Sequence, residues 1–214
     1  MRINKTRRFA VLGLLVGMLV PALGVSARAN AAEVALAEGQ QSAIFAGGCF
    51  WCVESDFDKV PGVLKTISGY TGGQKLNPTY EEVSAGYTGH AEAVQVVFDS
   101  KKVSYQQLVE FFWRSIDPTT LNSQFCDHGN QYRTAIFYNS PEQKQIAEQS
   151  KAALEKNKPF KERIVTEITQ AGPFYPAEEY HQDFHVKSSI RYDFYRYRCG
   201  RDQRVKELWG KKAG

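Results

Sequence analysis

Two cysteines, Cys49 and Cys52, have the residue type and spacing for thiol chemistry, and they lie in the run GGCFWC at residues 47–52. A short apolar run at residues 43–46 precedes them, and apolar residues recur at helical spacing after them. Cys49 is therefore expected where a strand turns into a helix. Unpartnered N–H groups and the helix dipole at a helix start favour a thiolate, the nucleophilic form of cysteine.

The neighbours of Cys49 fit this interpretation. Gly47 and Gly48 allow a tight turn and leave the sulfur uncrowded. Phe50 and Trp51 lie between the two cysteines, which favours an apolar pocket around the sulfur. Small buried cysteines beside ordinary core aromatics are the alternative interpretation of the same run.

A thiolate that removes an oxygen atom needs a group that protonates the oxygen and hydroxyls that orient it. Glu92 and Asp127 are the carboxyl candidates, and the hydroxyl candidates are Tyr80, Tyr87 and Tyr132. Each of these residues also has an ordinary interpretation as a surface carboxylate, a turn residue or a packed loop tyrosine.

Five separated motifs together resemble the A-type peptide-methionine sulfoxide reductases, in the order of that family. They are GGCFWC at 47–52, NPTY at 77–80, TGHAEAV at 88–94, DHGNQYR at 127–133 and PFYPAE at 173–178. The resemblance spans residues 42–185.

The resemblance implies a role for each polar candidate except Tyr87. Cys49 would attack the sulfoxide sulfur and Glu92 would protonate the departing oxygen. Tyr80 and Tyr132 would donate hydrogen bonds to that oxygen, and Asp127 would position water and polar groups. The residues alone agree, because a carboxyl at the edge of an apolar, aromatic site should have a raised pKa and be protonated near neutrality.

The resemblance further implies that Phe50 and Trp51 hold the S-methyl group of the substrate. The substrate would be the S epimer of methionine sulfoxide, free or in oxidised proteins. No metal or organic cofactor is implied. The implied fold is a small α/β plait with a coil-rich C-terminal tail.

All four cysteines, Cys49, Cys52, Cys126 and Cys199, remain open to several interpretations. Two structural disulfides are the usual arrangement in an exported protein, whereas C-x-x-C has redox spacing. We predict that a sulfenic acid on Cys49 condenses with Cys52, and that Cys199 relays the disulfide to an external thioredoxin-like dithiol. Cys126 is the weakest candidate, as a buried loop thiol whose thiolate is disfavoured beside Asp127.

Residues 1–31 have the pattern of a secretory signal peptide: basic residues, an apolar run and a small-residue cleavage site near Ala31. An uncleaved membrane anchor is the alternative. The protein is expected to be exported, with the periplasm as its location. Residues 1–31 contain five basic residues and no acidic one, and 27 less 5 leaves 22 basic against 23 acidic residues. The nearly neutral mature chain gives no support for a nucleic-acid partner.

Residues 32–41 are expected to form a flexible leader, and residues 42–214 a single catalytic domain with a tail from about residue 190. The protein is expected to be a monomer. Predicted strands cover 63–73, 93–99, 134–138 and 163–169. Helices are predicted after Ser104 and Ser140 and at 177–184. The 93–99 strand is apolar throughout and is expected at the centre of the sheet. The alternation of strands and helices along the chain predicts a two-layer α/β (α+β) sandwich around a mixed central sheet, a ferredoxin-like plait.

Two rival functions use the same cysteines. A thioredoxin-like disulfide oxidoreductase would need only the C-x-x-C at a helix start. A zinc module would use Cys49, Cys52, Cys126 and His128, although this spacing fits zinc-ligand patterns poorly.

Overall fold

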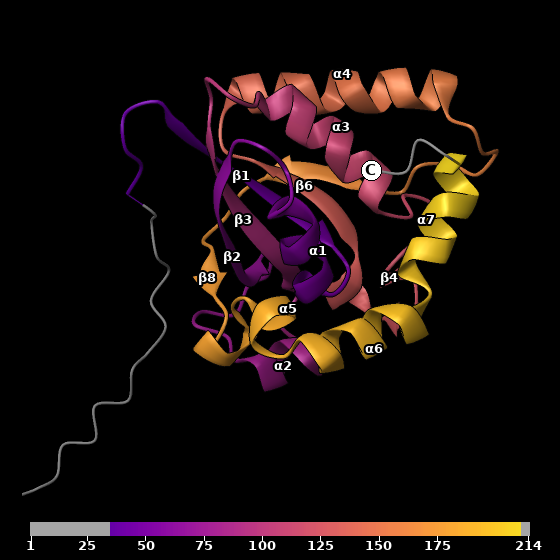
Figure 1. Cartoon of the computed structure of the whole chain (residues 1–214). Helices are drawn as coiled ribbons and strands as arrows, with labels where there is room; N and C mark the ends of the chain where they lie inside the picture. The colour runs from indigo at the N-terminus through magenta and orange to yellow at the C-terminus, as the bar shows by residue number, and fades with distance from the viewer. Residues whose placement is uncertain (1–34, 211–214) are drawn as a thin grey trace, which may run out of the picture.

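A computed structural model describes residues 35–210 of the chain, so the predicted signal peptide lies outside the described residues. One six-stranded mixed sheet forms its centre, in the order β7-β6-β1-β3-β2-β8 (Figure 1). The strands are β1 Gln40–Gly47, β2 Val63–Thr71, β3 Ala91–Asp99, β6 Thr134–Tyr138, β7 Glu167–Gln170 and β8 Tyr175–Pro176. All neighbours are antiparallel except β6 and β7, which are parallel.

Strand β3 lies at the centre of the sheet, as its sequence predicts. It pairs with β1 on one side and β2 on the other, and all its residues except Asp99 are buried. It begins two residues earlier than predicted, at Ala91, so Glu92 is inside the strand and opposite Tyr70 of β2. The carboxyl of Glu92 is therefore fixed by the most constrained strand of the fold.

The helices of the α/β layer are α1 Phe50–Phe57, α3 Tyr105–Ser115 and α4 Pro141–Asn157. The Ser104 and Ser140 hydroxyls accept from the backbone N–H of Gln107 and Gln143, each at 3.2 Å, so both predicted caps are present. Helices α1 and α3 pack on one face of the sheet, where the ring of Phe45 in β1 stacks between Phe57 and Phe112. The predicted two-layer α/β fold with a mixed sheet is confirmed.

The predicted coil-rich tail is wrong, because the end of the chain is helical. Short helix α5, Phe184–Lys187, leads into α6, Ser189–Cys199, and α7, Arg201–Trp209. Gly200 separates α6 from α7 with φ of 69°, a conformation that glycine adopts at little cost. The helical pattern was hidden because α6 buries Tyr192 but exposes Ile190, Phe194 and Tyr197, so that its apolar residues do not mark one inner face. In α7 only Arg201, Val205 and Leu208 are buried.

Three further predicted boundaries change. Strand β1 begins at Gln40, inside the predicted leader. The strand predicted over 163–169 is β7, which starts only at Glu167, because the preceding backbone bonds instead to Pro118 and the side chain of Lys151. The helix predicted over 177–184 is a 3-10 turn, Glu179–His181, followed by α5, since Asp183 has a positive φ of 52° that interrupts it.

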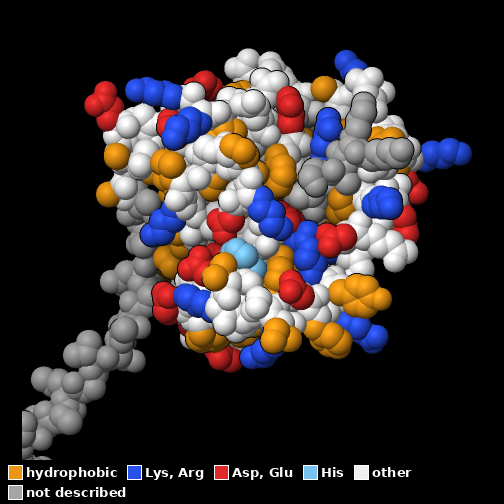
Figure 2. All heavy atoms as spheres, viewed as in Figure 1, with side chains coloured by type: hydrophobic (Ala, Val, Ile, Leu, Met, Phe, Trp, Pro, Cys, Tyr) orange, Lys and Arg blue, Asp and Glu red, His pale blue; other side chains and the backbone are white. Residues whose placement is uncertain are grey.

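The long polar segment between α3 and β6 is ordered around the small hairpin β4 Ser123–Gln124 and β5 Asp127–His128. A 3-10 turn, Asn130–Tyr132, follows it, and α2, Tyr80–Ser84, lies in the loop between β2 and β3. Acidic and basic side chains are interspersed over the face shown in Figure 2, which has no large patch of a single charge. No helix within residues 35–210 is both long enough and apolar enough to cross a membrane.

Candidate active site

Cys49 lies in the turn between β1 and α1, as predicted, and is the residue that caps α1. Gly48 has φ of 84°, and a Cβ atom there would lie 2.5 Å from Cβ of Gln124. A Cβ atom on Gly47 would lie 2.9 Å from Ile116. Gly48 thus permits the turn and the close approach of the loop that contains Gln124, and Gly47 permits the close approach of Ile116 at the end of α3. The sulfur is not uncrowded, since Cys49 is only 8% exposed.

A small cavity of about 80 Å³ opens beside Cys49. It brings together the seven residues to which the sequence gave catalytic or substrate-binding roles, with one addition from α6. Its lining is Cys49, Phe50, Trp51, Tyr80, Glu92, Asp127, Tyr132 and Tyr195. Tyr87, the remaining hydroxyl candidate, is exposed and does not line the cavity.

Glu92 is the buried acid of this cavity, at 2% exposure. Its Oε2 accepts a hydrogen bond from the backbone N–H of Phe50 at 3.0 Å. Burial raises the pKa of Glu92 to about 8, and the nearby charge of Asp127 adds to the rise, whereas the hydrogen bond from Phe50 opposes it. Glu92 is therefore protonated at neutral pH, as expected from the sequence.

The expectation of a favoured thiolate at Cys49 is wrong for this closed site. Burial raises the pKa of the Cys49 thiol well above its usual range, and neighbouring Cys52 and Glu92 raise it further. The pKa of Cys52 is lowered by its hydrogen bond with Cys49 and by the charges of Arg201 and Arg196. The cost of burying a thiolate away from solvent thus outweighs the stabilisation that the N-terminus of α1 offers it, and Cys49 is held as a neutral thiol.

The two cavity tyrosines that were predicted to bind oxygen are both proton donors at neutral pH. Burial raises the pKa of Tyr80 to about 12 and raises that of Tyr132 above its usual range. Tyr80 starts α2, and its backbone N–H donates to Glu178 Oε1 at 2.9 Å, while the Tyr70 hydroxyl donates to Glu178 Oε2 at 2.8 Å. Glu178, from the PFYPAE motif, therefore positions Tyr80.

Phe50 and Trp51 form the apolar wall of the cavity. The indole N–H of Trp51 donates to Nδ1 of His181 at 3.1 Å, and the indole stacks on Phe184 with ring centroids 3.8 Å apart. The ring of His181 also lies 5.1 Å from that of Phe50 and 4.3 Å from that of Tyr80. Sequence reasoning missed His181, although it lies just after the PFYPAE motif.

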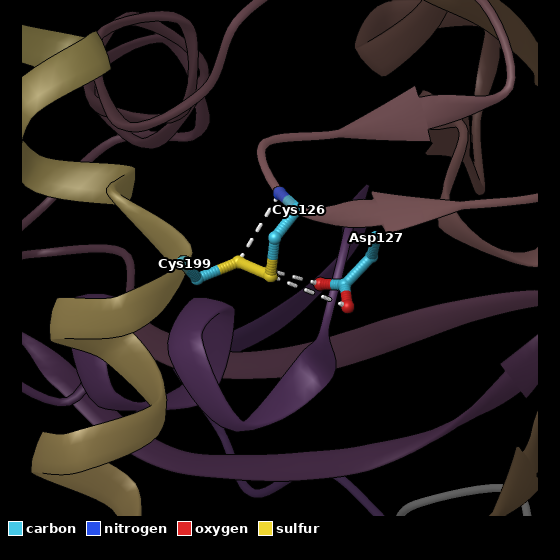
Figure 3. A group of neighbouring side chains, drawn as sticks. All are labelled: Cys126, Asp127 and Cys199. Carbon is cyan, nitrogen blue, oxygen red and sulfur yellow. Dashed lines mark hydrogen bonds between the residues drawn. A yellow bond between two sulfur atoms is a disulfide. The ribbon is translucent and has the colours of Figure 1, made fainter.

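The cysteine pairing differs from the predicted one. Cys126 and Cys199 form a disulfide (Figure 3), with Cα atoms 4.9 Å apart, whereas Cys49 and Cys52 are free and buried. Cys126 is exposed rather than buried, so its dismissal as a buried loop thiol is wrong. The hairpin and α6 meet here, and neither the spacing of 73 residues nor the local pattern revealed this contact.

Asp127 joins the disulfide to the cavity. Its Oδ1 lies 3.8 Å from the sulfur of Cys126 and its Oδ2 lies 3.9 Å from that of Cys199 (Figure 3). The Tyr195 hydroxyl donates to Asp127 Oδ2 at 2.5 Å. Tyr195 is the lining residue that sequence reasoning missed. The usable signal was its spacing of four residues from Cys199, which puts both on one face of a helix.

The zinc hypothesis does not fit this arrangement. Among the described residues, the group of candidate ligands within 4.8 Å of one another is Cys126, Asp127 and Cys199, and two of these sulfurs share a disulfide. A disulfide sulfur is not the thiolate that zinc binds. The larger hollow between α3, α4 and α7, about 830 Å³, has Trp113 and Trp209 in its lining and contains no cysteine.

Comparison with known proteins agrees with the motifs. A family model described as peptide methionine sulfoxide reductase matches residues 41–213. The peptide methionine sulfoxide reductase MsrA of Bacillus licheniformis is 52% identical over 177 residues, covering 83% of this chain and 98% of the relative. The protein of the same name from Listeria monocytogenes is 52% identical over 172 residues, covering 80% of this chain and 97% of the relative.

Two solved structures have the same fold. Methionine sulfoxide reductase A of Corynebacterium diphtheriae aligns with a TM-score of 0.65 and 36% identity, over 72% of this chain and 77% of that one. Mxr1 from Saccharomyces cerevisiae in its reduced form aligns with a TM-score of 0.62 and 32% identity, over 71% of this chain and 87% of that one.

Proposed function

The chain belongs to the A-type peptide-methionine sulfoxide reductase family, and we propose how its own residues carry out the reaction of that family. It is a thiol-dependent oxidoreductase, a peptide-methionine (S)-S-oxide reductase, which returns oxidised methionine, free or in proteins, to methionine. The observation that supports the assignment of roles is the pairing of a buried, protonated carboxyl, Glu92, with a buried thiol, Cys49, in one aromatic cavity.

In the first step the sulfur of Cys49 attacks the sulfoxide sulfur. Glu92 gives its proton to the sulfoxide oxygen and receives the thiol proton of Cys49, so that Glu92 is unchanged at the end. The oxygen, with one proton, ends on Cys49 as a sulfenic acid, and the substrate leaves as the thioether. The thiol is thereby activated only when an oxygen atom is present to take the proton.

The hydroxyls of Tyr80 and Tyr132 stabilise the negative charge that develops on the oxygen, because they line the same cavity and are protonated. Phe50 and Trp51 contact the S-methyl group. This wall is held rigidly by His181 and Phe184, which supports a site that accepts one epimer. Asp127 positions water and polar groups at the opposite side.

Recycling of Cys49 uses the other three cysteines. The sulfenic acid condenses with the Cys52 thiol to form a disulfide and release water. The Cys199 thiolate attacks that disulfide and the Cys126 thiolate then attacks Cys199, which frees both Cys49 and Cys52 and leaves the Cys126–Cys199 bond. Support comes from the cysteine states in the structure, two free thiols and one disulfide, which are those of the last step.

An external thioredoxin-like dithiol reduces Cys126–Cys199, and the exposure of Cys126 supports this step. The reaction needs no metal or organic cofactor. The mature protein acts in the periplasm as a monomer after removal of residues 1–31. The sequence pattern of that segment supports export.

The test uses purified protein without residues 1–31, dithiothreitol, and the separate R and S sulfoxide epimers of a blocked methionine. We expect the S epimer to be converted to the thioether and the R epimer to remain. A parallel assay measures disulfide exchange with insulin, the activity of the thioredoxin-like rival. Exchange activity without sulfoxide reduction would overturn the proposed function.

A further inference from the structure

Tyr195 occupies the catalytic cavity, although it belongs to the tail that carries a recycling cysteine. Building on the proposed function, we propose that the Cys126–Cys199 disulfide holds the Tyr195 ring in the cavity, so that methionine sulfoxide enters only after this disulfide has been reduced. Reduction of the enzyme would then precede the binding of each new substrate.

The first support is the geometry of α6. Tyr195 and Cys199 are four residues apart and lie on one face of the helix. The sulfur of Cys199 lies 3.9 Å from the Tyr195 hydroxyl and bonds to Cys126, whose backbone N–H donates to the same sulfur at 3.2 Å. The covalent bond therefore fixes α6 within one turn of Tyr195.

The second support is what Tyr195 touches. Its hydroxyl donates to Asp127, and its ring meets the edge of Trp51, with centroids 5.8 Å apart and planes at 84°. Trp51 is one of the residues that contact the S-methyl group in the proposed reaction. The tyrosine ring thus lies against the surface that the substrate needs.

The third support is the size of the space that remains. The cavity of about 80 Å³ is well below the roughly 300–1,000 Å³ that is typical of small-molecule sites. Cys49 itself is 8% exposed. A methionine sulfoxide side chain must displace something to reach this sulfur, and Tyr195 is the lining residue that belongs to the same helix as Cys199.

The release requires only a small movement. Tyr192 is buried in a cluster with Cys52 and Phe184, and Arg196 is paired with Asp56 at 2.8 Å. These contacts do not involve the disulfide and keep α6 attached when it is reduced. Tyr195 is half-buried, so its side chain can swing outward once Cys199 is free, without undocking of the helix.

The experiment compares two forms of the mature protein, one fully reduced and one with the Cys126–Cys199 disulfide and a free Cys49, verified by peptide mapping. Single-turnover thioether formation is measured without reductant. In the wild type we expect the disulfide form to react at least tenfold more slowly. Tyr195→Ala should bring the ratio of the two rates close to one, and Tyr195→Phe should leave it large, because the ring rather than the hydroxyl fills the space.

Tyr197→Ala is the matched control, since Tyr197 is on the same helix and 82% exposed, and it should keep the wild-type ratio. A measurement that needs no variant is the alkylation of Cys49 by iodoacetamide, which should also be slower in the disulfide form. Equal rates for the two wild-type forms, or a large ratio that persists in Tyr195→Ala, would overturn the inference. Absence of thioether formation in both forms would instead overturn the proposed function and, with it, the inference.

Discussion

The backbone N–H of Phe50 donates a hydrogen bond to Oε2 of Glu92 at 3.0 Å, across 42 residues of sequence. This bond joins the first residue of α1, directly after Cys49, to the central strand β3. Glu92 and the turn that carries Cys49 are therefore held in one frame by a bond from the backbone of α1 to the Glu92 carboxyl.

Replacing the nucleophile should abolish reduction. Cys49→Ser keeps the size of the side chain but removes the thiol, and a serine hydroxyl does not form a sulfenic acid. Thioether formation is measured with excess dithiothreitol, and the unfolding midpoint in urea checks that the variant folds. Activity within tenfold of the wild type would assign the nucleophile to another residue.

Removing the acid should slow the chemical step while leaving the fold intact. Glu92→Gln keeps the shape and an acceptor for the Phe50 N–H but has no acidic proton. We expect the single-turnover rate to fall roughly 10²–10⁴-fold, the usual contribution of a positioned general acid. Substrate affinity should change little. A near-normal rate would mean that Tyr80 or Tyr132 protonates the oxygen.

The rate of the wild type should depend on pH through Glu92. Its pKa is about 8, so the acid form is present below that pH and is lost above it. Single-turnover rates should therefore fall as pH rises through 8, and this fall should be absent in Glu92→Gln. A rate that rises through the same range would show that ionisation of Cys49 limits the step.

The same raised pKa has a consequence for stability, with a defined sign. The folded state holds the Glu92 proton up to about pH 8, whereas an unfolded chain loses it near pH 4.3. The stabilisation that the folded state gains by keeping the Glu92 proton is complete at low pH, and it is lost as pH rises through 8. Glu92→Gln should consequently melt at a higher temperature than the wild type at pH 9, and the two should converge near pH 4.

Peptide mapping after one equivalent of sulfoxide, without reductant, should show the order in which the cysteines form disulfides. Wild type should end with the Cys126–Cys199 bond and free Cys49. Cys199→Ser should stop at Cys49–Cys52, and Cys126→Ser should accumulate a bond between Cys199 and one of the first two cysteines. Undiminished formation of Cys126–Cys199 in Cys52→Ser would make Cys52 a bystander and Cys199 the direct partner of Cys49.

Arg201 should be the main stabilising residue of the tail. It is 1% exposed, donates to the carbonyls of Gly47 and Ser115, and lies 3.4 Å from Asp56. Arg201→Gln leaves buried acceptors unpaired and should lower the free energy of unfolding by roughly 3 kcal/mol. Urea denaturation measures this change. Lys206→Gln, at an exposed position of the same helix, should have little effect.

Much of the fold and site could be predicted from short-range patterns. The paired glycines before Cys49 predict a tight turn, and Gly48 has the positive φ that favours glycine. The apolar run that contains Val94 predicts a central strand that is buried on both faces, as β3 is. The motifs that carry Glu92, Tyr80 and Tyr132 are local, so their residues were identified individually. Their convergence on one cavity followed from the family resemblance and not from spacing.

The missed features all depend on contacts between distant segments. Cys126 meets Cys199 because α6 packs against the hairpin, and the apolar side chains that α6 exposes to solvent masked its helical pattern. Tyr195 was missed for the same reason. The protonation of Cys49 was mispredicted because the helix start is local, whereas the burial that outweighs it is built by Glu92, Tyr195 and other residues far along the chain.

The bond between Arg201 and the carbonyl of Gly47 also sets an order in time, because the two residues are 154 positions apart. A ribosome adds roughly 5–20 residues per second, so Arg201 is synthesised on the order of ten seconds after Gly47, whose carbonyl it binds. The burial of Cys49 in the folded chain depends on the C-terminal tail, because Tyr195 lines its cavity and Arg201 bonds to the turn before it. The sulfur is therefore covered only when the tail has folded onto the sheet, and not when the strand that precedes it forms.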